Sequence, residues 1–255
     1  MNRNIAFICL SLFLVFSSCT SKKEILYMQD AEKYNNTELE YSQSVIQPND
    51  ILRIRVETLI PEAALAYNKS SNFNMQANDL ELMKLDGYLV SEENTIKFPV
   101  LGEISVEGNT TQGLEEKLKK LLVDGGHLVD PTVYVRIINS KFTIIGEVNS
   151  PGTYNFTEQT ITILQALGYA NDLTINGKRE DILVIRETNG VRNISHMDLT
   201  SADLFNSPYY LIKPNDVIVV NPNDTKVKSA GFIGEVGTIL TIASLALSVT
   251  ILLTR

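Results

Sequence analysis

The side chains in this sequence that are able to perform chemistry are mainly carboxylates. Acidic residues are adjacent at Glu92-Glu93 and Glu115-Glu116, and nearly so at Asp79 and Glu81. Two carboxylates on either side of a sugar are sufficient for glycoside hydrolysis. The first pair falls in a predicted turn and the second on the solvent face of a predicted helix, where acidic residues usually lie. We therefore predict no catalytic residues and no enzymatic activity.

Metal and cofactor sites have equally little support. The chain contains two His, His127 and His196, and two Cys, Cys9 and Cys19. Two His without neighbouring Cys favour structural roles over metal ligation, and two Cys are too few for a thiolate metal site or a disulfide framework. We predict neither a metal nor a cofactor.

Composition indicates the broad class of the protein. The 255 residues are 44 % hydrophobic and carry a formal net charge of −8, which is enough apolar material for one large or two small cores. The acidic balance, without a dense block of Lys and Arg, argues against nucleic acid as a partner because phosphate neutralisation requires clustered cations.

The first eighteen residues have the organisation of a secretory signal. A short basic start precedes an apolar stretch from Ile5 to Phe16 and then small residues, as in signal peptides. The run Phe16-Ser17-Ser18-Cys19 resembles a bacterial lipobox, so we predict cleavage before Cys19 and acylation of its sulfur. A plain secretory peptide is the alternative. Residues 19–44 are largely polar and aperiodic, and we predict that they form an acylated tether.

The other end of the chain is also apolar. No charged residue occurs from Val236 to Leu253, and a helix of this length reaches roughly 27 Å, close to the hydrocarbon thickness of a bilayer. After a linker over 223–234, we therefore predict a C-terminal transmembrane helix over 235–255. One face of this helix, about 120° wide, collects small and hydroxyl residues: Gly234, Gly237, Thr238, Thr241, Ser244 and Ser248.

Two interpretations of this face compete. Small residues on a membrane helix usually mark close packing against another helix, whereas in a ring of helices the hydroxyls would line a wet pore. Leu245 and Leu252 interrupt the face, which favours packing when the pattern is taken alone. Both interpretations predict self-association or a partner helix.

Between its two ends the chain repeats a short motif. Ile46-Gln47-Pro48-Asn49-Asp50 returns as Ile212-Lys213-Pro214-Asn215-Asp216, and apolar residues follow each copy. A Pro-Asn-Asp turn before such a run is typical of a turn that leads into a strand. The repeat therefore predicts two related small domains.

The remaining patterns predict short strands around two helices, an α+β architecture. A hairpin is expected to join 87–90 to 95–100 about Glu92-Glu93-Asn94, and Thr111 is expected to cap a helix. Residues 57–86 are expected to form a long loop. Further strands are predicted at 52–56, 132–137, 141–148, 181–186 and 217–220, with a second helix near 160–168 and an apolar stripe on the first at Leu114, Leu118, Leu121 and Leu122.

Aromatic residues of the second predicted domain raise the question of sugar stacking. Core or strand positions are the favoured interpretation for all four of them, which are Tyr154, Phe156, Tyr209 and Tyr210.

Several runs in the body, taken in order, carry a family resemblance. G-Y-L-V, N-T-I-K-F-P, L-G-E-I-S-V-E-G-N-T-T and D-P-T-V-Y-V-R, between residues 87 and 136, resemble the polysaccharide export domain of Wza-type outer-membrane lipoproteins. T-I-I-G-E-V-N-S-P-G-T-Y and S-P-Y-Y-L-I-K-P-N-D-V-I-V-V, which follow, resemble an SLBB domain, a β-grasp module. We therefore expect a small polysaccharide export domain over 45–140 and an SLBB domain over 141–222.

The resemblance implies a function that the residues alone do not specify. It implies an outer-membrane export channel for capsular or exopolysaccharide, a homo-oligomeric, octamer-like ring with a periplasmic body and a pore formed by its C-terminal helices. The implied partners are the transported polysaccharide, membrane lipid and an inner-membrane polysaccharide co-polymerase or tyrosine kinase. With this resemblance added, the Thr/Ser face is interpreted as the lumen. The alternative is a membrane-anchored periplasmic glycan-binding or scaffolding lipoprotein without a pore.

Overall fold

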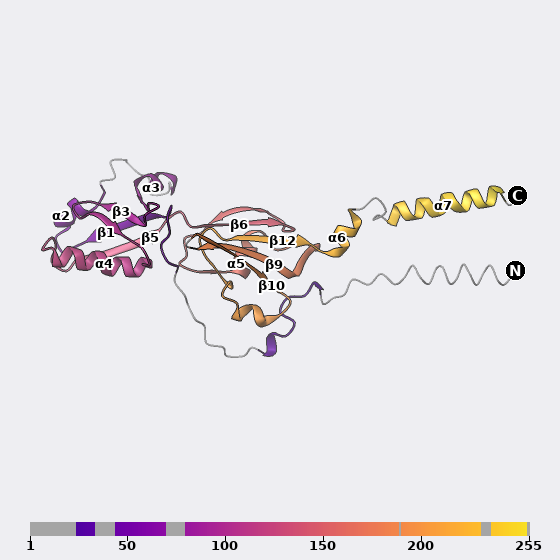
Figure 1. Cartoon of the computed structure of the whole chain (residues 1–255), viewed down its shortest axis with the longest axis horizontal. Coiled ribbons are helices and arrows are strands. Elements are labelled where there is room, and N and C mark those ends of the chain that lie inside the picture. Colours follow the sequence, from indigo (N-terminus) through magenta and orange to yellow (C-terminus); the bar gives the residue numbers. More distant parts are fainter. Residues whose placement is uncertain (1–23, 34–43, 70–79, 189, 231–235, 254–255) are drawn as a thin grey trace.

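The computed structural model describes residues 24–33, 44–69, 80–188, 190–230 and 236–253. Two units that each combine helices and strands follow one another, a first unit over 44–139 and a second unit over 140–222 (Figure 1). Two helices leave the second unit on the side away from the first. The predicted α+β class is confirmed for both units.

The first unit is a three-stranded antiparallel sheet of order β2-β1-β5, with a separate β3–β4 hairpin and one long helix. Its elements are β1 (Ile51–Glu57), α2 (Pro61–Ala64), η3 (Leu65–Tyr67), α3 (Leu80–Asp86), β2 (Tyr88–Leu89), β3 (Thr95–Phe98), β4 (Gly102–Ser105), α4 (Thr111–Asp124) and β5 (Thr132–Ile137). Leu114, Leu118 and Leu122 of α4 are completely buried. Their spacing of four residues places them on one helix face, and burying each contributes about 1.5–3 kcal/mol.

Three expectations for the first unit need correction. A turn does form about Glu92-Glu93-Asn94, where the Ser91 N–H donates to the Thr95 carbonyl at 2.9 Å. The strand over 95–98, however, pairs with β4 after a second turn at Val100, with φ 65°, and β2 pairs with β1. The helix cap is Thr110, not Thr111, since its Oγ1 accepts a hydrogen bond from the Gly113 N–H at 3.1 Å. The predicted loop over 57–86 contains α2, η3 and α3, while residues 70–79 lie outside the described part.

The second unit contains a five-stranded sheet of order β10-β9-β12-β6-β7, in which only β12 and β6 run parallel. A capping box at Thr162 and Gln165 starts α5, which packs on the core of this sheet. The elements are β6 (Lys141–Gly146), β7 (Gly152–Asn155), β8 (Ile161–Thr162), α5 (Ile163–Tyr169), β9 (Gly177–Thr188), β10 (Val191–Met197), η4 (Ala202–Asn206), β11 (Leu211–Ile212) and β12 (Val217–Pro222).

One glycine permits the parallel pairing of β6 with β12. Gly146 has φ 98°, and a Cβ added there would lie 2.0 Å from the carbonyl oxygen of Val220. Any side chain would both strain the backbone and push β12 away.

The repeated motif forms the same turn in both units. Asn49 and Asn215 adopt left-handed φ values of 69° and 67°, a conformation that Asn tolerates well. The Asp50 carboxylate accepts a hydrogen bond from the N–H three residues before it at 2.8 Å. Asp216 makes the equivalent bond at the same distance. The two turns therefore start β1 and β12 with one shared hydrogen-bond pattern.

Part of the predicted tether is docked on the second unit. The N–H groups of Met28 and Gln29 donate to the carbonyl oxygens of Leu199 and Thr200 at 3.0 and 2.8 Å. Asp30 then accepts from the Ala202 N–H at 2.6 Å. The single turn η2 (Ala31–Lys33) follows. Residues 24–33 are thus fixed by backbone hydrogen bonds, which leave no trace in hydrophobic periodicity.

Two helices follow the second unit. α6 (Asp224–Ser229) lies in the predicted linker, and Asn223 caps it by accepting from the Lys226 N–H at 2.9 Å. α7 (Val236–Leu253) forms where a helix was predicted. Across the described segments, however, no helix has the combination of length and apolarity that crossing a membrane requires. The transmembrane assignment of 235–255 is therefore not supported.

Candidate functional site

The predicted site residues divide between described and undescribed segments. Cys19 and Gly234 lie outside the described residues, and so does the side chain of Thr238. Gly237, Thr241, Ser244 and Ser248 lie on α7, as predicted.

The hydroxyl groups of α7 bond within their own helix. Thr241 Oγ1 donates to the Gly237 carbonyl at 2.8 Å, and Ser248 Oγ donates to the Ser244 carbonyl at 2.8 Å. Ser244 Oγ donates in turn to the carbonyl of Thr241 at 2.9 Å. Such back-bonding satisfies the hydroxyl proton in an apolar environment and leaves the oxygen lone pairs as acceptors on the helix surface.

Every α7 side chain that the structure describes is exposed. Leu240, Leu245 and Leu247 are each more than 60 % exposed. Among the described residues, no other element therefore covers these side chains of α7.

A buried ion pair organises the chain segment before β12. Arg186 of β9 contacts Asp216 through two parallel hydrogen bonds, from Nε to Oδ1 at 2.9 Å and from Nη2 to Oδ2 at 2.7 Å. Its side chain is 9 % exposed and that of Asp216 is fully buried. Two guanidinium N–H groups also donate to the carbonyl oxygens of Pro208 and Leu211, at 3.2 and 2.8 Å. The guanidinium therefore joins three parts of the segment 208–216 to the sheet.

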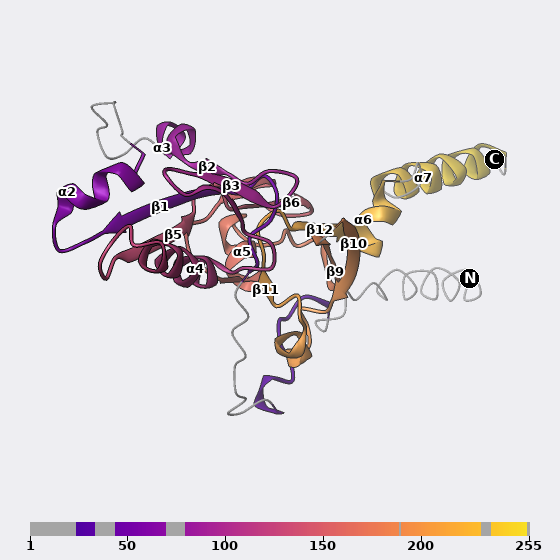
Figure 2. The same cartoon turned by 60° about the vertical axis from the view of Figure 1, so that its left-hand side comes forward.

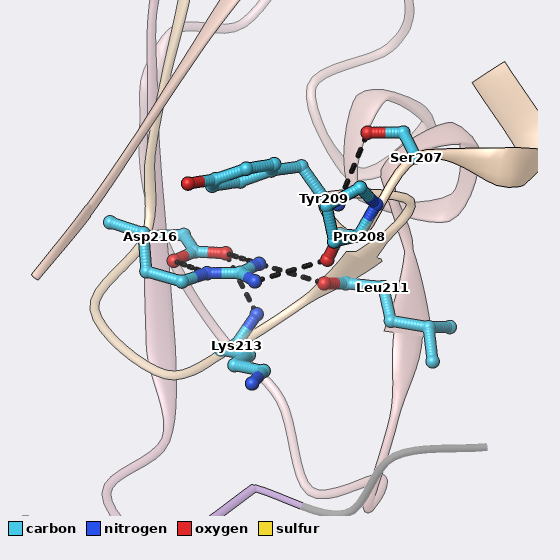
Figure 3. Close-up of polar contacts among 7 residues, drawn as sticks. Ser207, Pro208, Tyr209, Leu211, Lys213 and Asp216 are labelled. Carbon is cyan, nitrogen blue, oxygen red and sulfur yellow. Dashed lines mark hydrogen bonds and ion pairs between the residues drawn. The ribbon is translucent and has the colours of Figure 1, made fainter. Parts of the chain in front are cut away.

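Two further contacts surround the Arg186–Asp216 ion pair (Figure 3). The backbone N–H of Lys213 donates to Asp216, and the Tyr209 ring lies over the guanidinium at 4.7 Å from its centroid. Burial, followed by the nearby positive charge of Arg186, lowers the pKa of the Lys213 ammonium. A bidentate buried pair whose guanidinium also donates to two carbonyl oxygens is a positioning element. The sequence analysis missed it, although Asp216 belongs to the repeated turn.

The aromatic residues considered for sugar stacking pack with the core of the second unit. Phe156 is buried, while Tyr154, Tyr209 and Tyr210 are partly buried against the same cluster. Tyr154 also donates to the Ser150 carbonyl and stacks on the ring of Phe142. These contacts support the core interpretation.

The acidic pairs and the histidines have structural environments where they are described. Glu115 is not simply solvated, because its Oε1 accepts from the backbone N–H of Val135 at 2.8 Å and so joins α4 to β5. Glu92 and Glu93 are exposed in a turn, whereas Asp79 and the Glu81 side chain lie outside the described part.

The two histidines lie apart from each other in contacts of different kinds. His196 Nδ1 lies 2.5 Å from Asp181 Oδ1 on the β9–β10 ladder. His127 contacts the edge of Tyr67 with ring centroids 5.9 Å apart. Within the described segments, no group of three or more His, Cys, Asp or Glu is arranged to hold a metal ion.

Comparison with known proteins identifies both units. Residues 39–138 match the family described as polysaccharide biosynthesis/export protein, and residues 140–220 match the SLBB domain. The chain is 26 % identical over 204 residues to the EPS I polysaccharide export outer membrane protein EpsA of Ralstonia solanacearum. The alignment covers 76 % of this chain and 52 % of that protein, so the chain spans about half the length of this curated relative.

Proposed function

Because the chain belongs to the polysaccharide export proteins of the Wza type, in which an export domain precedes an SLBB domain, we propose that it exports polysaccharide at the bacterial outer membrane. This family is one of transport or scaffold proteins and not of enzymes. The observation that carries the proposal is the order of the two matches, which together extend from residue 39 to residue 220.

The relative adds support for the location. It is named as an outer membrane export protein for EPS I polysaccharide. We extend the outer-membrane location, and polysaccharide as the substrate class, to this chain. The chain would be attached by acylation at Cys19, with both folded units in the periplasm.

The proposal has a finer part that concerns assembly. Several copies would form a ring, with α7 helices side by side and their Thr/Ser faces toward a wet lumen, and the ring would contact an inner-membrane polysaccharide co-polymerase. The uncharged sequence from Val236 to Leu253 supports this arrangement. So does the hydrogen bonding of Thr241, Ser244 and Ser248, since hydroxyls with satisfied protons form only weak contacts with a passing glycan. A neutral lining would not retain a charged polymer.

Two substitutions on one face of α7 test the finer part. Thr241→Leu with Ser248→Leu replaces hydroxyls of the proposed lumen by bulky apolar groups, and we expect surface polysaccharide to fall strongly at normal protein level. Ala243→Leu with Leu247→Phe adds bulk to the opposite face and should leave export unchanged. Surface polysaccharide is measured in a deletion strain that expresses each variant from the native promoter. Equal export by both variants would contradict a lumen lined by this face.

A second candidate is a membrane-anchored glycan-binding or scaffolding lipoprotein without a pore. The specific observation in its favour is that the described helices include none suited to crossing a membrane. Single-particle imaging of the acylated protein extracted from outer membranes separates the two candidates. A closed ring with a continuous axial lumen supports the channel, and monomers or solid small oligomers support the anchored scaffold.

A further inference from the structure

A cavity of about 340 Å³ lies in the first unit, beside β1 and β2. Figure 2 shows α3 and β2 next to β1, and residues of all three elements line the cavity. Its volume is at the lower end of the range for small-molecule sites. The side chains that matter for its chemistry are Arg53, Arg55, Lys69, Asp86 and Tyr88.

The cavity exists because the edge of β1 is only partly covered. β2 pairs with β1 at Ile51 and Leu52 and then ends. Farther along, the Asn68 side chain takes the place of a strand, since it accepts from the Val56 N–H and donates to the Val56 carbonyl, both at 2.9 Å. The backbone polar groups of successive residues point alternately to the two edges of a strand. Those of Ile54, which lines the cavity, therefore point to this edge, between Leu52, which β2 covers, and Val56, which Asn68 covers.

Three cationic side chains face this cavity in a protein with a net charge of −8. Arg53 and Arg55 are on the exposed face of β1 and are separated by one residue, so both point to the same side of the strand. Arg53 Nη1 has a weak contact with Met83 Sδ at 3.6 Å. Arg55 contacts Glu57 at 2.9 Å, but both side chains are exposed, and exposed pairs contribute little. A guanidinium has five N–H donors, most of which remain available for an anion.

Two buried oxygen atoms belong to residues that line the cavity. They are the hydroxyl oxygen of Tyr88 and Oδ2 of Asp86, and both atoms are buried. The Tyr88 side chain is only 4 % exposed. Burial raises its pKa to about 12, so the hydroxyl keeps its proton as a donor. Both atoms are inaccessible from the cavity, so a ligand there meets the cationic side chains and not these two oxygens.

We propose that this cavity binds an acidic sugar unit of the exported polysaccharide. The carboxylate of a uronic acid would contact Arg53 and Arg55. Lys69, whose Nζ donates to the Gly87 carbonyl at 2.6 Å and lies 4.4 Å from the Tyr88 ring centroid, adds a third positive charge. The inference rests on the proposed export function and adds to it a substrate class, an anionic polymer.

Chemistry and charge favour an acidic sugar over a neutral one. A neutral glycan needs no guanidinium groups, whereas a local cluster of positive charge in an overall acidic protein attracts an anionic polymer. The three cationic side chains at the cavity match a sugar that carries an acid group.

The test measures binding by the purified full-length protein in detergent. The probe is a tetramer of glucuronic acid, compared with the corresponding tetramer of glucose, by isothermal titration calorimetry. We expect the acidic tetramer to bind at least tenfold more tightly than the neutral one. Its affinity should fall as salt is raised from 50 to 300 mM, because both partners are charged.

Variants locate the binding. Arg53→Gln with Arg55→Gln should weaken binding of the acidic tetramer at least tenfold. Lys119→Gln with Arg192→Gln, which removes the same two charges from exposed pairs elsewhere, should change it less than twofold. Circular dichroism confirms that each variant is folded.

Two results would overturn the inference. One is equal affinity for the acidic and neutral tetramers. The other is an affinity for the acidic tetramer that is the same in the Arg53→Gln, Arg55→Gln variant as in the wild type. That result is also expected if the cavity instead receives an acidic side chain of a neighbouring subunit. Because binding is measured without export, either result leaves the export proposal to its own test on surface polysaccharide.

Discussion

The two copies of the Pro-Asn-Asp turn predict opposite effects of the same substitution. Asp50 is 3 % exposed and Asp216 is 1 % exposed, and both accept a backbone N–H at 2.8 Å. Only Asp216 faces a cation, Arg186, whereas no ion pair reaches Asp50 within the described residues. Asp50→Asn preserves an oxygen for the turn and removes a buried charge. We therefore expect this substitution to stabilise the protein at neutral pH.

The magnitude follows from the pKa of the carboxyl group. Burial raises the pKa of Asp50 from 3.8 to about 6, against a smaller lowering by the Gln47 N–H. The folded state therefore binds a proton more tightly than the unfolded state, and stability falls as pH rises from about 4 to about 6. At roughly 1.4 kcal/mol per unit, the charged group costs up to about 3 kcal/mol at pH 8. Asp50→Asn should recover most of that at pH 8 and about 1 kcal/mol at pH 4.5.

Asp216→Asn is the matched control with the opposite expectation. It removes one partner of a buried bidentate pair and leaves the Arg186 guanidinium with an uncompensated charge. Breaking such a pair costs about 3–5 kcal/mol. The free energy of unfolding of the second unit should therefore decrease at pH 8, although the chemical change is identical to that at Asp50.

The assay must report the two units separately. The protein is equilibrated in a series of urea concentrations at pH 4.5 and at pH 8, and is then labelled with a deuterium pulse at one fixed pH. Mass spectrometry of the peptides that contain β1 and β12 gives the fraction of each unit that is unfolded, and hence its free energy of unfolding. The reasoning would be refuted if Asp50→Asn destabilised β1 at pH 8. It would equally be refuted if the gain at pH 8 were no larger than the gain at pH 4.5.

Three further substitutions test local features. Gly146→Ala should destabilise the second unit by about 3 kcal/mol or more through backbone strain and overpacking, as measured by urea denaturation. Gly168→Ala serves as the control, because a Cβ added there meets nothing within 4 Å. Thr162→Ala removes the capping box of α5 and should cost about 1 kcal/mol in the same measurement, so an unchanged midpoint would contradict the capping role. Tyr27→Phe removes the 2.5 Å hydrogen bond to Asp172 and should speed deuterium exchange in residues 24–33 several-fold, with no change in β9.

The sequence predicts those parts of the fold that local patterns determine. The buried stripe of Leu114, Leu118 and Leu122 follows from helical periodicity. The two Asp residues of the repeated turns follow from turn chemistry. Both signals are contained within a few residues, so no knowledge of distant contacts is required to find them.

The missed elements depend on distant contacts. The edge strand β10 leaves both Val191 and Ile194 exposed, so alternation of buried apolar residues does not mark it. Glu115 has the sequence signature of a solvated helix residue, and only the position of β5 gives it a partner. The β3–β4 pairing depends on the turn at Val100, whose positive φ is unusual for a β-branched residue.

The candidate site was predictable to the same limited degree. The α7 helix and the face with Thr241, Ser244 and Ser248 follow from the apolar C-terminal sequence. The cluster of Arg53 and Arg55 with Asp86 and Tyr88 does not, because β1 and α3 come together only in the fold. In the sequence, Arg53 and Arg55 are simply the polar half of an alternating strand.

The docked segment 24–33 has a mechanical consequence. Tension applied between this segment and α7 does not have to run along the covalent chain through the first unit. The bonds from Met28 and Gln29 to Leu199 and Thr200, with that of Asp30 to Ala202, connect the segment directly to the second unit. These hydrogen bonds carry the force in parallel with the covalent chain. While they hold, a pull from either end deforms the SLBB domain, and the export domain remains unloaded.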